Sequence, residues 1–196
     1  MIIGFHLIWT TYGHWFPNDP RGSWSDEVWQ PGIGELAELD NHRKVTRPRP
    51  VPRHVLQGFL GAARSASQWP SVLLTAADID AVGAAFAETA AQMELPVHAC
   101  AVLPNHAHMV VGRGPLAYER IVNRLKGRSA QRVRETRGLT VASQRAQRAP
   151  VWTQGYWVRY IDHLEQMQLA IDYVNRNPVR DGLGQQKWTF IARFCG

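Results

Sequence analysis

The chain has 196 residues, 45% of them hydrophobic, with 22 Lys or Arg against 16 Asp or Glu. This length and apolar content predict one folded domain, residues 1–196, and exclude a disordered chain. The net charge of +6 favours a polyanionic partner. Cys100 and Cys195 stand outside any Cys-x-x-Cys pair, which excludes a disulfide framework and favours a reducing, cytoplasmic setting. No apolar run approaches transmembrane length, so we expect no membrane partner.

The N-terminal part of the chain predicts one strand followed by a long irregular region. Residues 2–11 are apolar enough for a strand at the centre of a sheet. Turn-forming residues then dominate, and we expect a loop-rich insertion at about residues 14–73. Within it, residues 42–53 are basic and rich in proline, which favours an extended surface arm. That arm either lies along nucleic acid or is a solvated linker.

The remainder of the chain alternates between helical and strand periods. The predicted elements are a helix from the N-cap Thr75 to about Met93, strands at 97–103 and 106–111, a helix at 116–137, a strand at 157–161 and a helix at 163–177. The last helix should end at Asn177, because Pro178 disfavours helical geometry in the residue before it. Its buried stripe is expected to comprise Leu164, Met167, Ile171 and Val174. This element order predicts an α+β fold, a ferredoxin-like split βαβ sandwich with a central antiparallel sheet and an added C-terminal helix.

Two histidines in the predicted strand at 106–111 indicate a metal site. His106 and His108 are two residues apart, so a strand projects both from the same face. Two parallel imidazoles supply half of a divalent-metal site, although hydrogen-bonded histidines on a sheet surface are the plainer alternative. Tyr173 and Asn177 lie one helical turn apart near the end of the last helix, where both could reach the same ion.

Two segments carry a resemblance to a known family. Leu103-Pro-Asn-His-Ala-His-Met-Val-Val111 resembles the histidine-hydrophobic-histidine signature of HUH endonucleases. Tyr173-Val-Asn-Arg-Asn-Pro-Val179 resembles the tyrosine segment of single-tyrosine transposases, above all the REP-associated tyrosine transposases. The likeness also covers residues 5–13, 125–127, 152–157 and 187–190, in the order of the family. Residues 15–53 exceed the compact family core, so no role is carried over to them.

The resemblance implies an enzyme of DNA transposition. Such an enzyme cleaves and rejoins single-stranded DNA through a 5′-phosphotyrosine intermediate, with Tyr173 as the nucleophile. His106, His108 and Asn177 would hold Mg²⁺ or Mn²⁺, and imidazole ligands favour Mn²⁺. The expected partner is single-stranded or hairpin DNA, and the expected assembly is a monomer or a homodimer.

Other residues and other functions remain open. Tyr160 is the second candidate nucleophile, and His6 in the first strand is expected in the core or behind the metal ligands. A basic stripe in the helix at 116–137 predicts contact with the DNA backbone, with a solvated helix face as the alternative. The stripe comprises Arg120, Arg124, Lys126, Arg128 and Arg132. The two other functions are a non-catalytic binding protein for structured DNA with a vestigial site, and a metal hydrolase whose histidines activate water.

Overall fold

The computed structural model describes residues 1–16, 19–21, 50–139 and 149–195. The chain forms two compact units. The first comprises Met1–Trp9, Leu73–Ala149 and Tyr156–Gly196, and the second comprises Thr10–Val72 and Pro150–Gly155. Much of the predicted insertion, including residues 42–49 of the basic arm, lies outside the described residues. The single domain with an insertion therefore stays a prediction.

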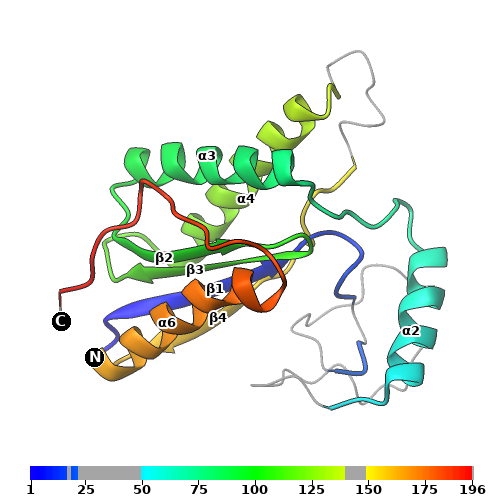
Figure 1. The fold of residues 1–196 in the computed structure, drawn as a ribbon, viewed down its shortest axis with the longest axis horizontal. Helices are drawn as coiled ribbons and strands as arrows, with labels where there is room; N and C mark the ends of the chain where they lie inside the picture. Colours follow the sequence, from blue (N-terminus) through cyan, green and yellow to red (C-terminus); the bar gives the residue numbers. More distant parts are fainter. Residues whose placement is uncertain (17–18, 22–49, 140–148, 196) are drawn as a thin grey trace. The chain divides into compact units, whose positions relative to one another are not determined.

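A four-stranded sheet forms the centre of the first unit (Figure 1). Its strands are β1 Gly4–Thr10, β2 Val97–Val102, β3 His106–Gly112 and β4 Trp157–Ile161, in the spatial order β2-β3-β1-β4. β1 pairs with β4, and β2 pairs with β3, both antiparallel. With the helices between them, these strands follow the split βαβ plan, so the predicted α+β, ferredoxin-like fold is confirmed.

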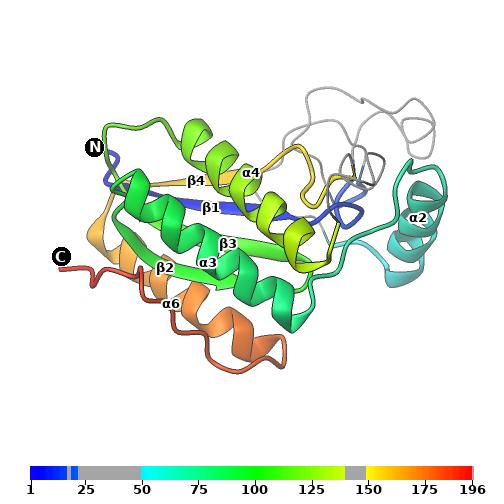
Figure 2. The same cartoon turned by 90° about the horizontal axis from the view of Figure 1, so that it is seen from above.

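Two helices cover one face of the sheet. α3 Ala76–Gln92 and α4 Tyr118–Thr136 lie side by side over it (Figure 2). The Trp9 ring of β1 packs edge-on against Phe86 of α3, with ring centroids 5.7 Å apart. α3 begins where predicted, because the Asp78 backbone N–H donates to the Thr75 hydroxyl and the Thr75 backbone N–H donates to the Asp78 carboxylate.

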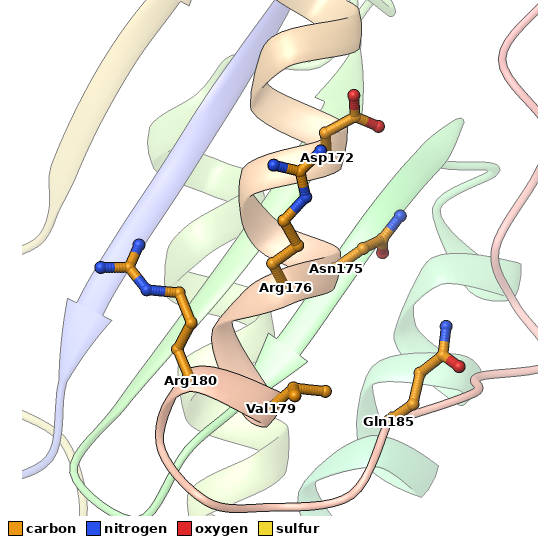
Figure 3. Close-up of a pocket in the computed structure, with 6 residues that line it drawn as sticks. All are labelled: Asp172, Asn175, Arg176, Val179, Arg180 and Gln185. Atoms are coloured by element: carbon orange, nitrogen blue, oxygen red, sulfur yellow. The ribbon is translucent and has the colours of Figure 1, made fainter.

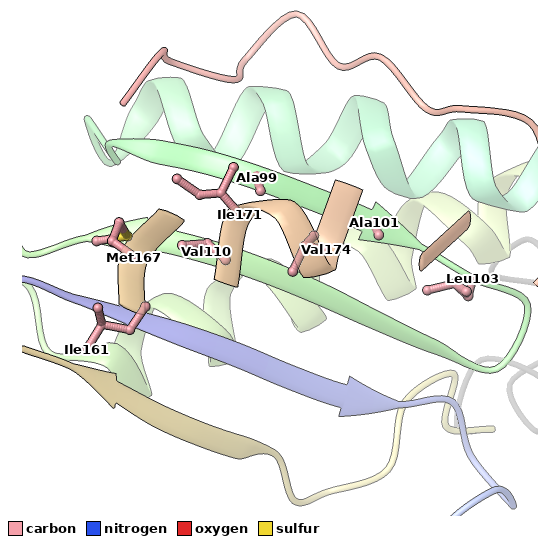
Figure 4. Close-up of a cluster of buried hydrophobic side chains, with 8 residues drawn as sticks. All are labelled: Ala99, Ala101, Leu103, Val110, Ile161, Met167, Ile171 and Val174. Atoms are coloured by element: carbon pink, nitrogen blue, oxygen red, sulfur yellow. The ribbon is translucent and has the colours of Figure 1, made fainter. Parts of the chain in front are cut away.

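The opposite face of the sheet is covered by α6, Leu164–Arg180 (Figure 4). The side chains buried between them are Ala99, Ala101, Leu103, Val110, Ile161, Met167, Ile171 and Val174. Met167 lies near Ile161, and Val174 lies farther along the helix towards Leu103, so α6 runs towards the turn between β2 and β3. Leu164, predicted in the buried stripe, is instead 56% exposed where the helix begins.

The chain after α6 returns along the outer edge of β2. The Gln186 amide accepts from the Val102 N–H and donates to the Val102 carbonyl. The Trp188 indole then donates to the Cys100 carbonyl at 3.1 Å. These bonds satisfy backbone groups that an edge strand would otherwise leave open to another chain.

The predicted end of the last helix is wrong. α6 continues through Pro178 and ends beyond it. A proline removes one backbone donor, but this loss falls in the last turn, where the Asn177 and Pro178 carbonyls still accept from Asp181 and Leu183. Gly182, with a φ of 77°, follows the helix in the left-handed conformation that favours glycine.

The second unit contains a helix that the sequence did not predict. α2 Arg53–Ser65 lies within residues that were expected to be loops. Phe59 and Ala63, one turn apart, are buried against Phe16. Burial of this short apolar stripe stabilises a helix that the surrounding composition disfavours. Among the residues that the structure describes, no helix combines the length and the apolar character needed to cross a membrane.

Candidate active site

β3 places the two predicted histidines on one face of the sheet. The rings of His106 and His108 lie either side of the buried Ala107 in sequence, with centroids 4.8 Å apart. Val110 is next on the same face and belongs to the cluster under α6, so both imidazoles face the side of the sheet that α6 covers. His108 is 4% exposed, whereas His106 is partly buried.

A third histidine, His6 of β1, lies against this pair. Its Nε2 is 3.0 Å from His108 Nδ1, and it is 5% exposed. On its other side, β4 places Arg159 opposite His6 in the strand register. The sequence placed His6 in the core or behind the metal ligands but did not give its partner, because the bond joins residues 102 positions apart.

Burial keeps the two inner rings neutral. Desolvation lowers the pKa of His6 to about 4, with a smaller contribution from the positive charge of Arg159. Burial also holds the pKa of His108 well below its usual value, with smaller effects from His106 and His6. At neutral pH each inner ring therefore has one protonated nitrogen and one lone pair. A neutral imidazole is the form that binds a metal ion.

α6 brings Tyr173 over the histidines. Its ring centroid is 5.6 Å from that of His108 and 6.0 Å from that of His6, and both contacts are edge-on. The side chain is 45% exposed, so the phenol packs on the histidines and also faces solvent. The tyrosine and the histidines singled out in the sequence therefore meet within one chain.

Tyr160, the second candidate nucleophile, lies on the opposite face of the sheet. Arg159, its neighbour in β4, shares the side of His6, so Tyr160 points towards α4. Its hydroxyl donates to the Tyr118 hydroxyl at 3.0 Å, and its ring packs against Phe5. The sheet separates this phenol from the histidines, which leaves Tyr173 as the stronger candidate.

Asn177 follows Tyr173 by one helical turn and is 7% exposed. Its Nδ2 is buried and has no hydrogen-bond partner among the residues that the structure describes. Leaving a buried polar atom unsatisfied costs about 1–3 kcal/mol, and such atoms often mark a site for a ligand. No three His, Cys, Asp or Glu side chains within the described ranges form a metal-binding group, so the candidate donors are the pair His106 and His108 with Asn177.

A groove opens along α6, the helix that carries Tyr173 (Figure 3). It has a volume of about 430 Å³ and is lined by Asp172, Asn175, Arg176, Val179, Arg180 and Gln185. The Asp172 carboxylate accepts from Gln168 at 2.9 Å, and neither Arg176 nor Arg180 has an ion-pair partner in the described part of the chain. Sequence reasoning missed these arginines, although they follow Tyr173 by three and seven residues and so lie on its side of the helix.

The predicted DNA-binding stripe lies on α4, across the sheet from the histidines. It consists of the exposed Arg120 and Arg124 and the partly buried Lys126, Arg128 and Arg132. Arg132 pairs with Glu88 of α3 at 2.7 Å, and burial lowers the pKa of Lys126 to about 8. The two exposed arginines are therefore the members best placed to contact DNA, and the structure does not bring them to the histidines.

Comparison with known proteins identifies the family. The model of the IS200-like transposases matches residues 71–177, whereas no curated protein matches the chain. One similar solved structure is a candidate transposase from Deinococcus radiodurans R1, which is 15% identical over 94% of this chain and 93% of its own, with a TM-score of 0.41. Another is a REP-associated tyrosine transposase bound to a REP hairpin, which is 11% identical over 93% of this chain and 70% of its own, with a TM-score of 0.46. Because the family match spans more than half of the chain and includes both histidines, Tyr173 and Asn177, the chain belongs to the IS200-like transposase family.

Proposed function

We propose that this chain cleaves and rejoins single-stranded DNA, with Tyr173 as the nucleophile. Transposition of DNA is the activity of its family, and the chemistry is inferred from the site. The observation that carries the proposal is the packing of Tyr173 onto His108 and His6 within one chain. A nucleophile and the groups that bind the scissile phosphate must be held together before reaction, and this arrangement supports that role.

The residues fit a divalent ion, which enzymes of this family generally use. His106, His108 and Asn177 would hold it, and two neutral imidazoles with one amide oxygen suit Mn²⁺ better than Mg²⁺. Asn177 would bind the ion through Oδ1, which leaves its buried Nδ2, a donor without a partner among the described residues, to donate to an oxygen of the DNA. When bound, the ion would polarise a non-bridging oxygen of the scissile phosphate.

The reaction is a transesterification that runs in both directions. The Tyr173 hydroxyl loses its proton and its oxygen bonds to phosphorus, while the bond from phosphorus to the 3′ oxygen breaks. The leaving oxygen takes up a proton and becomes a free 3′-hydroxyl, and the 5′-phosphate stays on the tyrosine. An incoming 3′-hydroxyl then attacks the same phosphorus and releases Tyr173, which joins the new strands.

Because Tyr173 packs on His108 and His6 of its own chain, we propose that a monomer acts without exchanging its tyrosine helix. Its partner is single-stranded or hairpin DNA. The exposed Arg176 and Arg180 beside the site, and Arg120 and Arg124 on α4, supply positive charge for the phosphate backbone.

An assay for a covalent adduct tests the proposal. Labelled single strands and hairpins from the DNA flanking the gene are incubated with the protein and Mn²⁺ or EDTA, then separated on a denaturing gel. The wild type should form an adduct with Mn²⁺ only, and Tyr173→Phe should form none. Tyr160→Phe removes a phenol on the opposite face of the sheet and should keep the adduct. An adduct that persists in Tyr173→Phe would contradict the proposal, and cleavage without any adduct would select the metal hydrolase.

A second candidate function is DNA binding without cleavage. The position of Arg120 and Arg124 favours it, because the sheet separates them from the histidines and they could bind DNA without a working site. This alternative would be selected if the protein binds hairpin DNA but forms no metal-dependent adduct with any substrate.

A further inference from the structure

We infer that Asn105 and His6 are positioning residues, which orient the rings of His106 and His108 so that both present Nε2 to the ion. The inference rests on the proposed metal site and assigns roles to two residues that are hydrogen-bonded to the histidine ligands. Each of the two histidine ligands has its Nδ1 in a hydrogen bond with a different neighbour. A hydrogen bond at Nδ1 orients the ring of a metal ligand and supports the tautomer whose lone pair is on Nε2.

The contact at His106 defines which nitrogen carries the proton. His106 Nδ1 donates to Asn105 Oδ1 at 2.6 Å, because an amide oxygen only accepts hydrogen bonds. In a neutral ring the lone pair is then on Nε2. Asn105 precedes β3 directly, so the turn that starts the strand also orients the first ligand.

The contact at His108 is equivalent, but its partner comes from another strand. His6 Nε2 lies 3.0 Å from His108 Nδ1, and both rings are almost completely buried. When His108 Nδ1 donates to His6 Nε2, the lone pair of His108 is on Nε2 and can bind an ion. The opposite direction would protonate His108 Nε2 and block it. Metal binding therefore selects His6 as the acceptor, and β1, the neighbour of β3 in the sheet, fixes the distance.

The same geometry argues against His6 as a third ligand through Nε2. An ion bound by His6 Nε2 would have to occupy the short space already filled by its hydrogen bond to His108. In the described ranges His6 also forms no group of three metal-binding side chains with the two ligands. His6 therefore acts through His108.

Mn²⁺ affinity, measured by electron paramagnetic resonance in the absence of DNA, tests the inference. His6→Leu and Asn105→Ala should each weaken Mn²⁺ binding by about 10–100-fold, as loss of a partner behind a ligand does. His6→Gln and Asn105→Asp keep an accepting oxygen and should recover most of this loss. His98→Leu is the matched control, since His98 is bonded to the Ala192 carbonyl outside the site and should not alter the affinity.

The outcomes separate this inference from the proposed function. If His108→Ala leaves Mn²⁺ affinity unchanged, the proposed metal site is wrong. If His108→Ala abolishes binding while His6→Leu and Asn105→Ala bind like His98→Leu, the inference alone is overturned. Long-range ¹H–¹⁵N spectra of the wild type with Mg²⁺ show which ring nitrogen of His108 carries the proton. This measurement uses no variant, so it does not depend on whether a variant folds. A proton on Nδ1 of His108 is expected, and a proton on its Nε2 would overturn the inference.

Discussion

Replacing Asn177 with leucine should stabilise the metal-free protein and remove its response to Mn²⁺. The side chain is 7% exposed, and its Nδ2 has no partner within the described residues. Relief of an unsatisfied buried group is worth about 1–3 kcal/mol. Leucine is somewhat larger than asparagine, and packing strain of about 1 kcal/mol opposes that gain. We expect a net gain of about 1 kcal/mol, which corresponds to a rise of about 2–4 °C in the melting temperature of a chain of this size.

Thermal unfolding with and without Mn²⁺ measures both effects. At an ion concentration of about 100 times Kd, the wild type should gain about 2.7 kcal/mol from binding, and Asn177→Leu should gain much less. Asn175→Leu, an exposed position on the same helix, is the control and should respond to Mn²⁺ like the wild type. A lower melting temperature of Asn177→Leu without metal, or full stabilisation of this variant by Mn²⁺, would contradict the role given to Asn177.

The remaining predictions concern charge. Replacing both Arg176 and Arg180 with alanine should weaken binding of a single strand and reduce its salt slope by about 1.4, since each phosphate contact contributes about 0.7. Fluorescence anisotropy at several salt concentrations measures the slope. An unchanged slope in the double variant would show that these two arginines do not contact the DNA. In the same assay, loss of the exposed guanidinium in Arg124→Ala should lower the affinity for hairpin DNA, and equal affinity would leave the α4 stripe as a solvated face. Burial raises the pKa of Asp78, but hydrogen bonds, the largest from Arg137, outweigh it and lower the pKa below its usual value. Because the folded-state pKa is the lower one, this carboxylate stabilises the fold above about pH 4, and the contribution is lost as the pH falls. Urea unfolding of Asp78→Asn should therefore show a weaker loss of stability below that pH, and a loss as steep as in the wild type would contradict the role of this ion pair.

Features that depend on neighbouring residues could be predicted from the sequence. Alternation in β3 was enough to place His106 and His108 on one face, because a strand has a side-chain period of two. The helical period correctly placed Met167 and Val174 on the buried face of α6, and it placed Tyr173 on a neighbouring face of the same helix. In each case the face on which a side chain lies depends only on the backbone geometry of its own strand or helix, so distant residues are not needed to predict it.

Features that depend on distant residues could not be predicted. The hydrogen bond between His6 and His108 requires the register of two strands, which no local pattern contains. α2 was missed because its burial against Phe16 outweighs the turn-forming composition nearby. The rule that a proline ends a helix failed at Pro178, because the lost donor lies in a turn whose other bonds remain. The pairing of Arg132 with another helix likewise appears only in the fold.

The most direct test of the account is identification of the residue that carries DNA. The adduct formed with Mn²⁺ is digested with protease and nuclease, and the modified peptide is sequenced by mass spectrometry. We predict a nucleotide joined through its 5′-phosphate to the oxygen of Tyr173. A nucleotide joined to any other residue, or joined through a 3′-phosphate, would contradict the account.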